Sequence, residues 1–173
     1  MSLTRSEMDA QLAELYAKIP RMTGCDGRCW TSCGPLGMSD RERQRIRAAG
    51  VRITPYEEAV VNVEGFWCDA LTGDKRCAVY DKRPLVCRLW GAVESMPCIY
   101  GCQPEGGYLT DDEAYRLIAE SLRIGGGQYP NVSATEIEGL REAVVKIRAR
   151  GPAGERRRGD EHIPAAFRAA GRS

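Results

Sequence analysis

The placement of the cysteines constrains this chain more than any other feature of its sequence. The 173 residues include eight cysteines, and all of them fall in two short stretches. The upstream stretch, GCDGRCWTSCG, contributes Cys25, Cys29 and Cys33, and the downstream stretch contributes Cys68, Cys77, Cys87, Cys98 and Cys102. Thiols grouped this tightly serve a metal ion, an iron–sulfur cluster or a disulfide framework.

The rest of the composition favours a metal over disulfides. Hydrophobic residues make up 43% of the chain, charged residues 28%, and the net charge is +1, which gives no strong attraction to nucleic acid or membrane surfaces. No apolar run approaches the roughly 20 residues of a membrane span, and residues 1–20 lack the apolar region of a secretory signal. We therefore expect a cytoplasmic protein, in which thiols stay reduced and are available to a metal.

The spacing of the thiols indicates the kind of metal site. All three close spacings are C-x3-C: Cys25/Cys29, Cys29/Cys33 and Cys98/Cys102. Zinc knuckles and ribbons most often use C-x2-C, and the wider reach suits a larger object such as an iron–sulfur cluster. The single histidine, His162, lies far from the cysteines, and sites made of thiolates alone select zinc or iron–sulfur clusters. We favour a [4Fe–4S] cluster, with zinc as the alternative, and treat all eight cysteines as candidate ligands of one or two sites.

Basic residues are concentrated beside the downstream cysteines. Four thiolates around zinc or a [4Fe–4S] core leave a net negative charge, and Arg76, Lys82, Arg83 and Arg88 are close in sequence to offset it. Pro84 predicts a helix start that puts Cys87 in the first turn. Unpaired N–H groups and the helix dipole are expected to lower the pKa of the Cys87 thiol there.

Outside the cysteines the sequence carries clear helix signals. Capping boxes that each open a helix are predicted at Thr4/Glu7, Ser39/Glu42, Thr110/Glu113 and Ser133/Glu136. Thr54–Pro55 predicts a further helix start, and the run Val60–Val63 fits either a helix or a strand. The glycine-rich segment from Cys25 to Cys33 predicts a loop. A turn at Thr72–Lys75 followed by a strand at Cys77–Tyr80 predicts a short hairpin.

These elements predict one mainly α domain over residues 1–150. Its centre, residues 22–108, is expected to be an irregular cysteine-rich core stabilised by metal, because loops of this composition bury little apolar surface by themselves. The predicted helices flank that core, with a short β-hairpin inside it. Residues 151–173 are rich in glycine, proline, alanine and arginine, which is typical of a disordered basic tail.

One downstream segment resembles a known family. The sequence CAVYDKRPLVCRLWG is similar to the C-x-[IV]-Y-x-x-R-P-x-x-C-R element of the YkgJ-like cysteine-cluster proteins, which are described as zinc- or iron-chelating and carry an upstream CxxCxxCC cluster. Cys77, Tyr80, Arg83, Pro84, Cys87 and Arg88 match that element, and Cys68 matches the cysteine that precedes it. The upstream copy departs from the pattern, because its gaps are wider and Gly34 stands in place of the last cysteine, and Cys98 and Cys102 are expected to make up the difference. The resemblance covers about residues 22–108 and implies a small metal- or cluster-binding domain, with Tyr80, Arg83 and Arg88 beside the cofactor.

The leading functional interpretation is therefore a metal-binding protein whose iron–sulfur cluster or zinc has a structural or redox role, with a redox or protein partner. One alternative is a zinc-stabilised module that binds nucleic acid or protein through Arg41–Arg52 and the arginine-rich tail. Arginines that alternate by two do not share one helical face, so a solvated helix is the simpler explanation of Arg41–Arg47. Another alternative is an accessory domain of a cluster-dependent enzyme. No catalytic constellation is apparent in the sequence.

Overall fold

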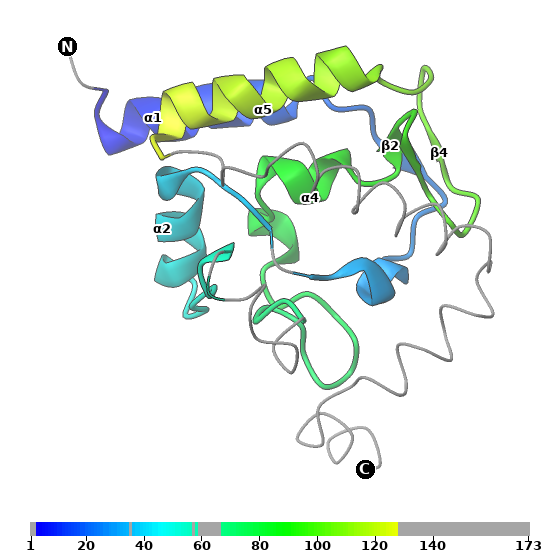
Figure 1. The fold of residues 1–173 in the computed structure, drawn as a ribbon, viewed down its shortest axis with the longest axis horizontal. Coiled ribbons are helices and arrows are strands. Elements are labelled where there is room, and N and C mark those ends of the chain that lie inside the picture. The colour runs from blue at the N-terminus through cyan, green and yellow to red at the C-terminus, as the bar shows by residue number, and fades with distance from the viewer. Residues whose placement is uncertain (1–2, 35, 57, 59–66, 128–173) are drawn as a thin grey trace.

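The computed structural model describes residues 3–34, 36–56, 58 and 67–127 (Figure 1). Three of its helices open with the predicted capping boxes: α1 (Arg5–Tyr16), α2 (Asp40–Ala48) and α5 (Asp111–Gly125). In each, the Ser or Thr side chain accepts from the backbone of the glutamate three residues on, and that glutamate returns the contact. Gly50 follows α2 with φ 87°, and Gly126 ends α5 with φ 76°, as expected of glycine after a helix.

The strands are short and lie in two small antiparallel sheets within the described residues. Strand β1 (Met22–Thr23) pairs with β4 (Gln103–Pro104), and β2 (Ala92–Val93) pairs with β3 (Met96–Pro97). The β1–β4 ladder joins the two cysteine-bearing stretches, since β1 leads into Cys25 and Cys102 directly precedes β4. Figure 1 shows β2 and β4 together at one end of the molecule, with α1 and α5 running side by side.

The apolar residues divide into two clusters. The larger joins the helices and is made of Leu12, Leu15, Ile19, Leu85, Leu89, Ala92, Val93, Ala114 and Ile124. The smaller is made of Ile46, Ile53, Ala70 and Val79, and Cys68 and Cys77 pack against it. The larger cluster therefore packs α1 and α5 together, while the smaller one, which includes Ile46 of α2, forms the apolar side of the cysteine-rich region.

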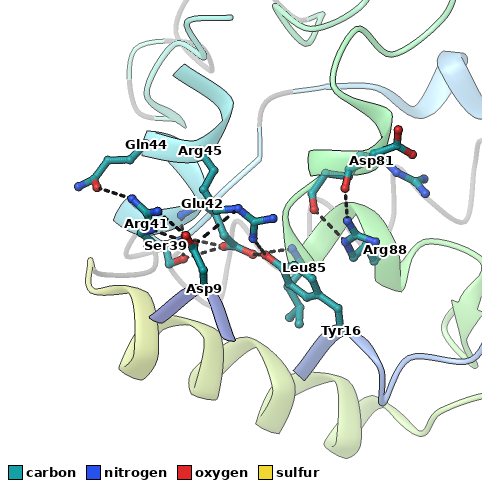
Figure 2. A network of polar contacts seen from close by, with 11 residues as sticks. Asp9, Tyr16, Ser39, Arg41, Glu42, Gln44, Arg45, Asp81, Leu85 and Arg88 are labelled. Carbon is teal, nitrogen blue, oxygen red and sulfur yellow. Dashed lines mark hydrogen bonds and ion pairs between the residues drawn. The ribbon is translucent and has the colours of Figure 1, made fainter. Parts of the chain in front are cut away.

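A single buried carboxylate connects the helices (Figure 2). Glu42 is 2% exposed. Its Oε1 accepts from the Tyr16 hydroxyl at 2.8 Å and from the backbone N–H of Leu85 at 2.7 Å. Its Oε2 accepts from the Ser39 N–H at 2.9 Å, the Ser39 hydroxyl at 2.8 Å and the Ser121 hydroxyl at 3.1 Å. The side chain thus ties the end of α1, the start of α2, the middle of α5 and the start of α4 (Leu85–Leu89) to one point.

Three of the four arginines of α2 have partners within the protein, which differs from the predicted solvated helix, while Arg47 is exposed. Arg41 bonds the Asp9 carboxylate through Nε at 2.9 Å, and its side chain is only 15% exposed. Arg45 lies 3.7 Å from the same carboxylate and 5.8 Å above the Tyr16 ring. Arg43 donates to the carbonyl of Ile53. These contacts pin α2 to α1 and to the chain after it, so these three side chains have intramolecular partners.

Several local predictions were wrong or lie outside the described residues. Cys77–Tyr80 is not a strand: a lone bridge joins Leu71 to Cys77, and the chain then turns into the 3₁₀ helix η3 (Tyr80–Lys82). The segment between Cys25 and Cys33 is not wholly a loop, because it contains the 3₁₀ helix η1 (Cys29–Ser32). The Val60–Val63 run, the Ser133/Glu136 helix and the 151–173 tail lie outside the described residues. In the part that is described, no helix is long and apolar enough to cross a bilayer.

The three capping-box glutamates offer a matched test of the Glu42 contacts. Glu7, Glu42 and Glu113 occupy the same position in their helices, but only Glu42 is buried. We expect Glu42→Gln to lower the free energy of unfolding by about 3 kcal/mol, because its amide group would face buried donors and leave them unpaired. Urea unfolding at pH 7 measures the change. Glu7→Gln and Glu113→Gln should lower the free energy of unfolding much less. An equal loss in all three variants would contradict the role given to the buried Glu42 carboxylate.

Candidate metal centre

The structure sorts the eight cysteines into two groups of four. The inner group consists of Cys33, Cys68, Cys77 and Cys87. The Cys68 N–H donates to the Cys33 carbonyl at 3.3 Å, which joins the upstream stretch to the downstream one. The Leu71–Cys77 bridge, supported by the Ala78 N–H to Ala70 carbonyl bond at 2.8 Å, folds Cys77 back toward Cys68. Cys87 lies in the first turn of α4, as predicted.

The pKa values of the inner thiols reflect both burial and mutual proximity. Burial raises the pKa of Cys33 to about 12, and the neighbouring Cys68, Cys29 and Cys77 contribute to the rise, while Arg83 opposes it. The pKa of Cys87 is raised by burial first and then by Cys68 and Cys33. The predicted lowering at Cys87 is therefore wrong for the metal-free thiol, because burial outweighs the N-terminus of a five-residue helix.

A cavity of about 40 Å³ adjoins the inner group. Its lining combines the thiols with the apolar cluster and one cation: Cys68, Cys77, Cys87, Arg83, Ile46, Ile53, Trp67, Ala70 and Val79 are among the residues around it. The lining is mostly apolar, and its charged residues are Arg83 and Asp69.

The outer group consists of Cys25, Cys29, Cys98 and Cys102. The β1–β4 register pairs Thr23 with Gln103, and the Cys102 thiol donates to the Gly24 carbonyl at 3.5 Å. The pKa of Cys102 is raised to about 11 by desolvation and by its hydrogen bond with Cys98. The pKa of Cys29 is raised by burial and then by Cys25, with Cys98 a smaller cause. These relations place the four thiols together at the end of the β1–β4 ladder.

The donor chemistry of both groups fits a thiophilic metal. All eight cysteines are free thiols. The hydroxyls of Thr31 and Ser32, in the helix between Cys29 and Cys33, are buried and have no hydrogen-bond partner among the described residues, and sulfur ligands of a bound cofactor are acceptors for such donors. In the described residues, however, no three Cys, His, Asp or Glu side chains converge as ligands of a single metal ion do. The thiols are neighbours, but they are not drawn onto one point.

The residues expected beside a cofactor have different surroundings. Arg83 lies 3.6 Å above the Tyr80 ring and donates to the Tyr80 carbonyl at 2.9 Å, and its charge lowers the pKa values of Cys29, Cys33 and Cys87. Arg88 instead donates to the carbonyls of Arg83 and Asp81 and lies over Tyr16 (Figure 2). Arg83 is therefore the cation whose charge lowers the pKa values of the thiols, while Arg88 holds the segment that carries Arg83 through its bonds to the Arg83 and Asp81 carbonyls.

Sequence reasoning anticipated only part of this division, because it expected Cys98 and Cys102 to complete the upstream ligands. Cys33 was not expected to join the downstream cysteines, and it does so while Cys29 stays close enough to raise its pKa; Cys98 and Cys102 join the upstream ones. The division depends on β1 and β4, which are two residues each and too short to give an alternating pattern. Arg28, whose pKa is raised by Asp26 first and by Cys102 to a smaller extent, was also missed, because an isolated arginine in a loop carries no signal.

The two groups predict an order of thiol reactivity in the metal-free protein. With iodoacetamide at pH 8, Cys25 should be alkylated first, because it is exposed, and Cys33 and Cys87 last. A pKa near 12 instead of 9 at Cys33 reduces its thiolate fraction about a thousandfold. Peptide mass spectrometry over time gives the order. In urea all eight thiols should react alike, and rapid native labelling of Cys87 would contradict the arrangement of the inner group.

Comparison with known proteins agrees with the resemblance found in the sequence. No curated protein and no solved structure matches the chain. Residues 24–102, which span all eight cysteines, match the model of the CxxCxxCC family, described as a "Putative zinc- or iron-chelating domain".

Proposed function

We propose that this protein binds an iron–sulfur cluster of the [4Fe–4S] type through the thiolates of the inner group, with zinc as the alternative occupant. The observation that carries the proposal is the gathering of four mutually close thiols, Cys33, Cys68, Cys77 and Cys87, around one arginine. Generic zinc or iron chelation is what the family match supports. The choice of a cluster goes beyond that match.

The arrangement of the thiols favours a cluster over a single ion. Four ligands of one zinc ion must converge within about 2.3 Å of a common point, and no such convergence exists in the described residues. In a [4Fe–4S] cluster each thiolate binds a different iron, so the ligands stand further apart. A bound cluster would supply one-electron exchange. The chain's own contribution would be four thiolates, the charge of Arg83 and an apolar wall made of Ile46, Ile53 and Val79.

Metal and sulfide analysis of protein purified without oxygen tests the proposal. A cluster predicts a brown protein with about four iron and four sulfide per chain. Cys87→Ser should lose this content, and Cys25→Ser, which changes the exposed thiol of the outer group, should retain it. A colourless protein with zinc at the inner thiols would replace the cluster with the zinc alternative. A protein with neither metal would overturn the proposal.

The charge of Arg83 should affect how firmly the cofactor is held. We expect Arg83→Gln to shorten the half-life of the bound metal against a chelator by about tenfold, as removal of a residue beside a metal site commonly does. Arg83→Lys should recover part of the loss because it keeps the positive charge. Arg123→Gln is the control, since Arg123 pairs only with the exposed Glu120 among the described contacts. Equal half-lives in the Gln and Lys variants would show that charge is not what Arg83 contributes.

A further inference from the structure

We propose that Cys98 and Cys102 form a reversible redox switch: a small-molecule disulfide oxidises the two thiols to a Cys98–Cys102 bridge, and a small thiol reduces the bridge again. The inference goes beyond the proposed function, because it assigns chemistry to two thiols outside the inner group and does not depend on which cofactor that group holds. Where cellular thiols are kept reduced, the few protein disulfides that form are usually transient and serve redox sensing or catalysis.

The backbone holds these two thiols against each other. Strand β3 ends at Pro97, directly before Cys98, and strand β4 begins at Gln103, directly after Cys102. The chain between them turns back on itself, and the turn is closed by the Gly101 N–H, which donates to the Cys98 carbonyl at 3.1 Å. Across this turn the Cys98 and Cys102 thiols hydrogen-bond to each other. Two groups that already touch react faster than two groups that must first be brought together.

The surroundings of the pair hold its two ends and leave room at its middle. Gly91 makes space for Cys98, since a β-carbon added at Gly91 would lie 3.4 Å from the Cys98 β-carbon. The Cys102 thiol also donates to the Gly24 carbonyl at 3.5 Å. Gly101 has a φ of 80°, and a β-carbon added there would meet no atom of a more distant residue within 4 Å. The turn therefore has room to bring the two sulfurs to the bonded distance of about 2.05 Å.

The position of the pair gives it access to a small disulfide in solution. Cys98 and Cys102 are half-buried, and Gly101 between them is exposed. In the inner group, by contrast, Cys68 and Cys77 pack against the apolar cluster. Thiol–disulfide exchange requires the attacking sulfur to reach the disulfide in line, so the outer pair should react before the inner thiols.

The exchange balances in two steps. The thiolate of one cysteine attacks a sulfur of the small disulfide, which forms a mixed disulfide and releases one small thiol. The thiolate of the other cysteine then attacks the protein sulfur of the mixed disulfide, which closes the Cys98–Cys102 bridge and releases the second small thiol. Two electrons pass from the protein to the small disulfide, and the two protons of the cysteines leave on the two small thiols.

Oxidised glutathione, applied without oxygen to the full chain as purified with its metal, tests the switch. After an acid quench, the protein is alkylated in denaturant and digested with trypsin, which leaves Cys98 and Cys102 together in the peptide of residues 89–116. This peptide should lose both alkyl groups, and dithiothreitol should restore them. The bridge should form at least about tenfold faster than glutathione attaches to any inner thiol, and the metal content should not change.

Single variants test the two steps. Cys98→Ser and Cys102→Ser should each stop at the mixed disulfide, with one glutathione on the remaining cysteine of the pair. Cys25→Ser is the matched control from the same group of thiols, and it should still close the bridge. Circular dichroism should show that all three variants remain folded.

The outcomes separate this inference from the proposed function. A disulfide from Cys98 or Cys102 to another cysteine would overturn the switch, as would two thiols that stay fully alkylated while Cys25 takes up glutathione. Release of the metal when the bridge closes would also overturn it, because the pair would then belong to the inner site. A reversible Cys98–Cys102 bridge in a protein that holds neither iron nor zinc would uphold the switch and refute the proposed function.

Discussion

The buried carboxylate of Glu42 is the interaction on which the helical part of this structure depends. A charge with almost no solvent contact is costly unless hydrogen bonds compensate it, and here five donor contacts come from four separate elements. None of those elements can shift without leaving a donor or the carboxylate unpaired. The apolar cluster around Leu12 and Leu89 supplies the bulk of the burial. Apolar contacts are not directional, however, so they do not by themselves fix how the helices are oriented. Glu42 fixes which faces meet.

The hydrogen bonds of Glu42 also affect the position of a cysteine. The N–H of Leu85 opens α4, and its bond to Glu42 sets where that short helix begins. Two residues later the same helix presents Cys87. Arg88, the next residue, lies over Tyr16, which itself donates to Glu42. The hydrogen bonds of Glu42 therefore help to position the Cys87 thiol, although no residue that takes part in them is a candidate metal ligand.

Sequence patterns predicted the parts of this fold that depend on local chemistry. The capping boxes at Thr4, Ser39 and Thr110 were confirmed. They are predictable because each one is completed within four residues of sequence. The cysteine-rich region was recognised by composition and by its family motif. The sequence led us to expect Cys98 and Cys102 beside the upstream cysteines. The place of Cys33 was not predictable, since it follows from its long-range contact with Cys68. The strand predicted at Cys77–Tyr80 was wrong. The chain turns after Cys77 into η3, where Tyr80 contacts Arg83, and tertiary context overrode β-propensity there.

The helix η1 gives the two groups of thiols a common support. Cys29 begins this helix and belongs to the outer group, while Cys33 directly follows it and belongs to the inner group. Four residues of 3₁₀ helix span about 8 Å, which is close to the distance over which physiological salt screens charge. Thiolates at its two ends would repel one another, and Arg83, which interacts with Cys29 as well as with Cys33, would moderate this effect. A one-residue deletion within Trp30–Ser32 would therefore disturb both groups of thiols at once.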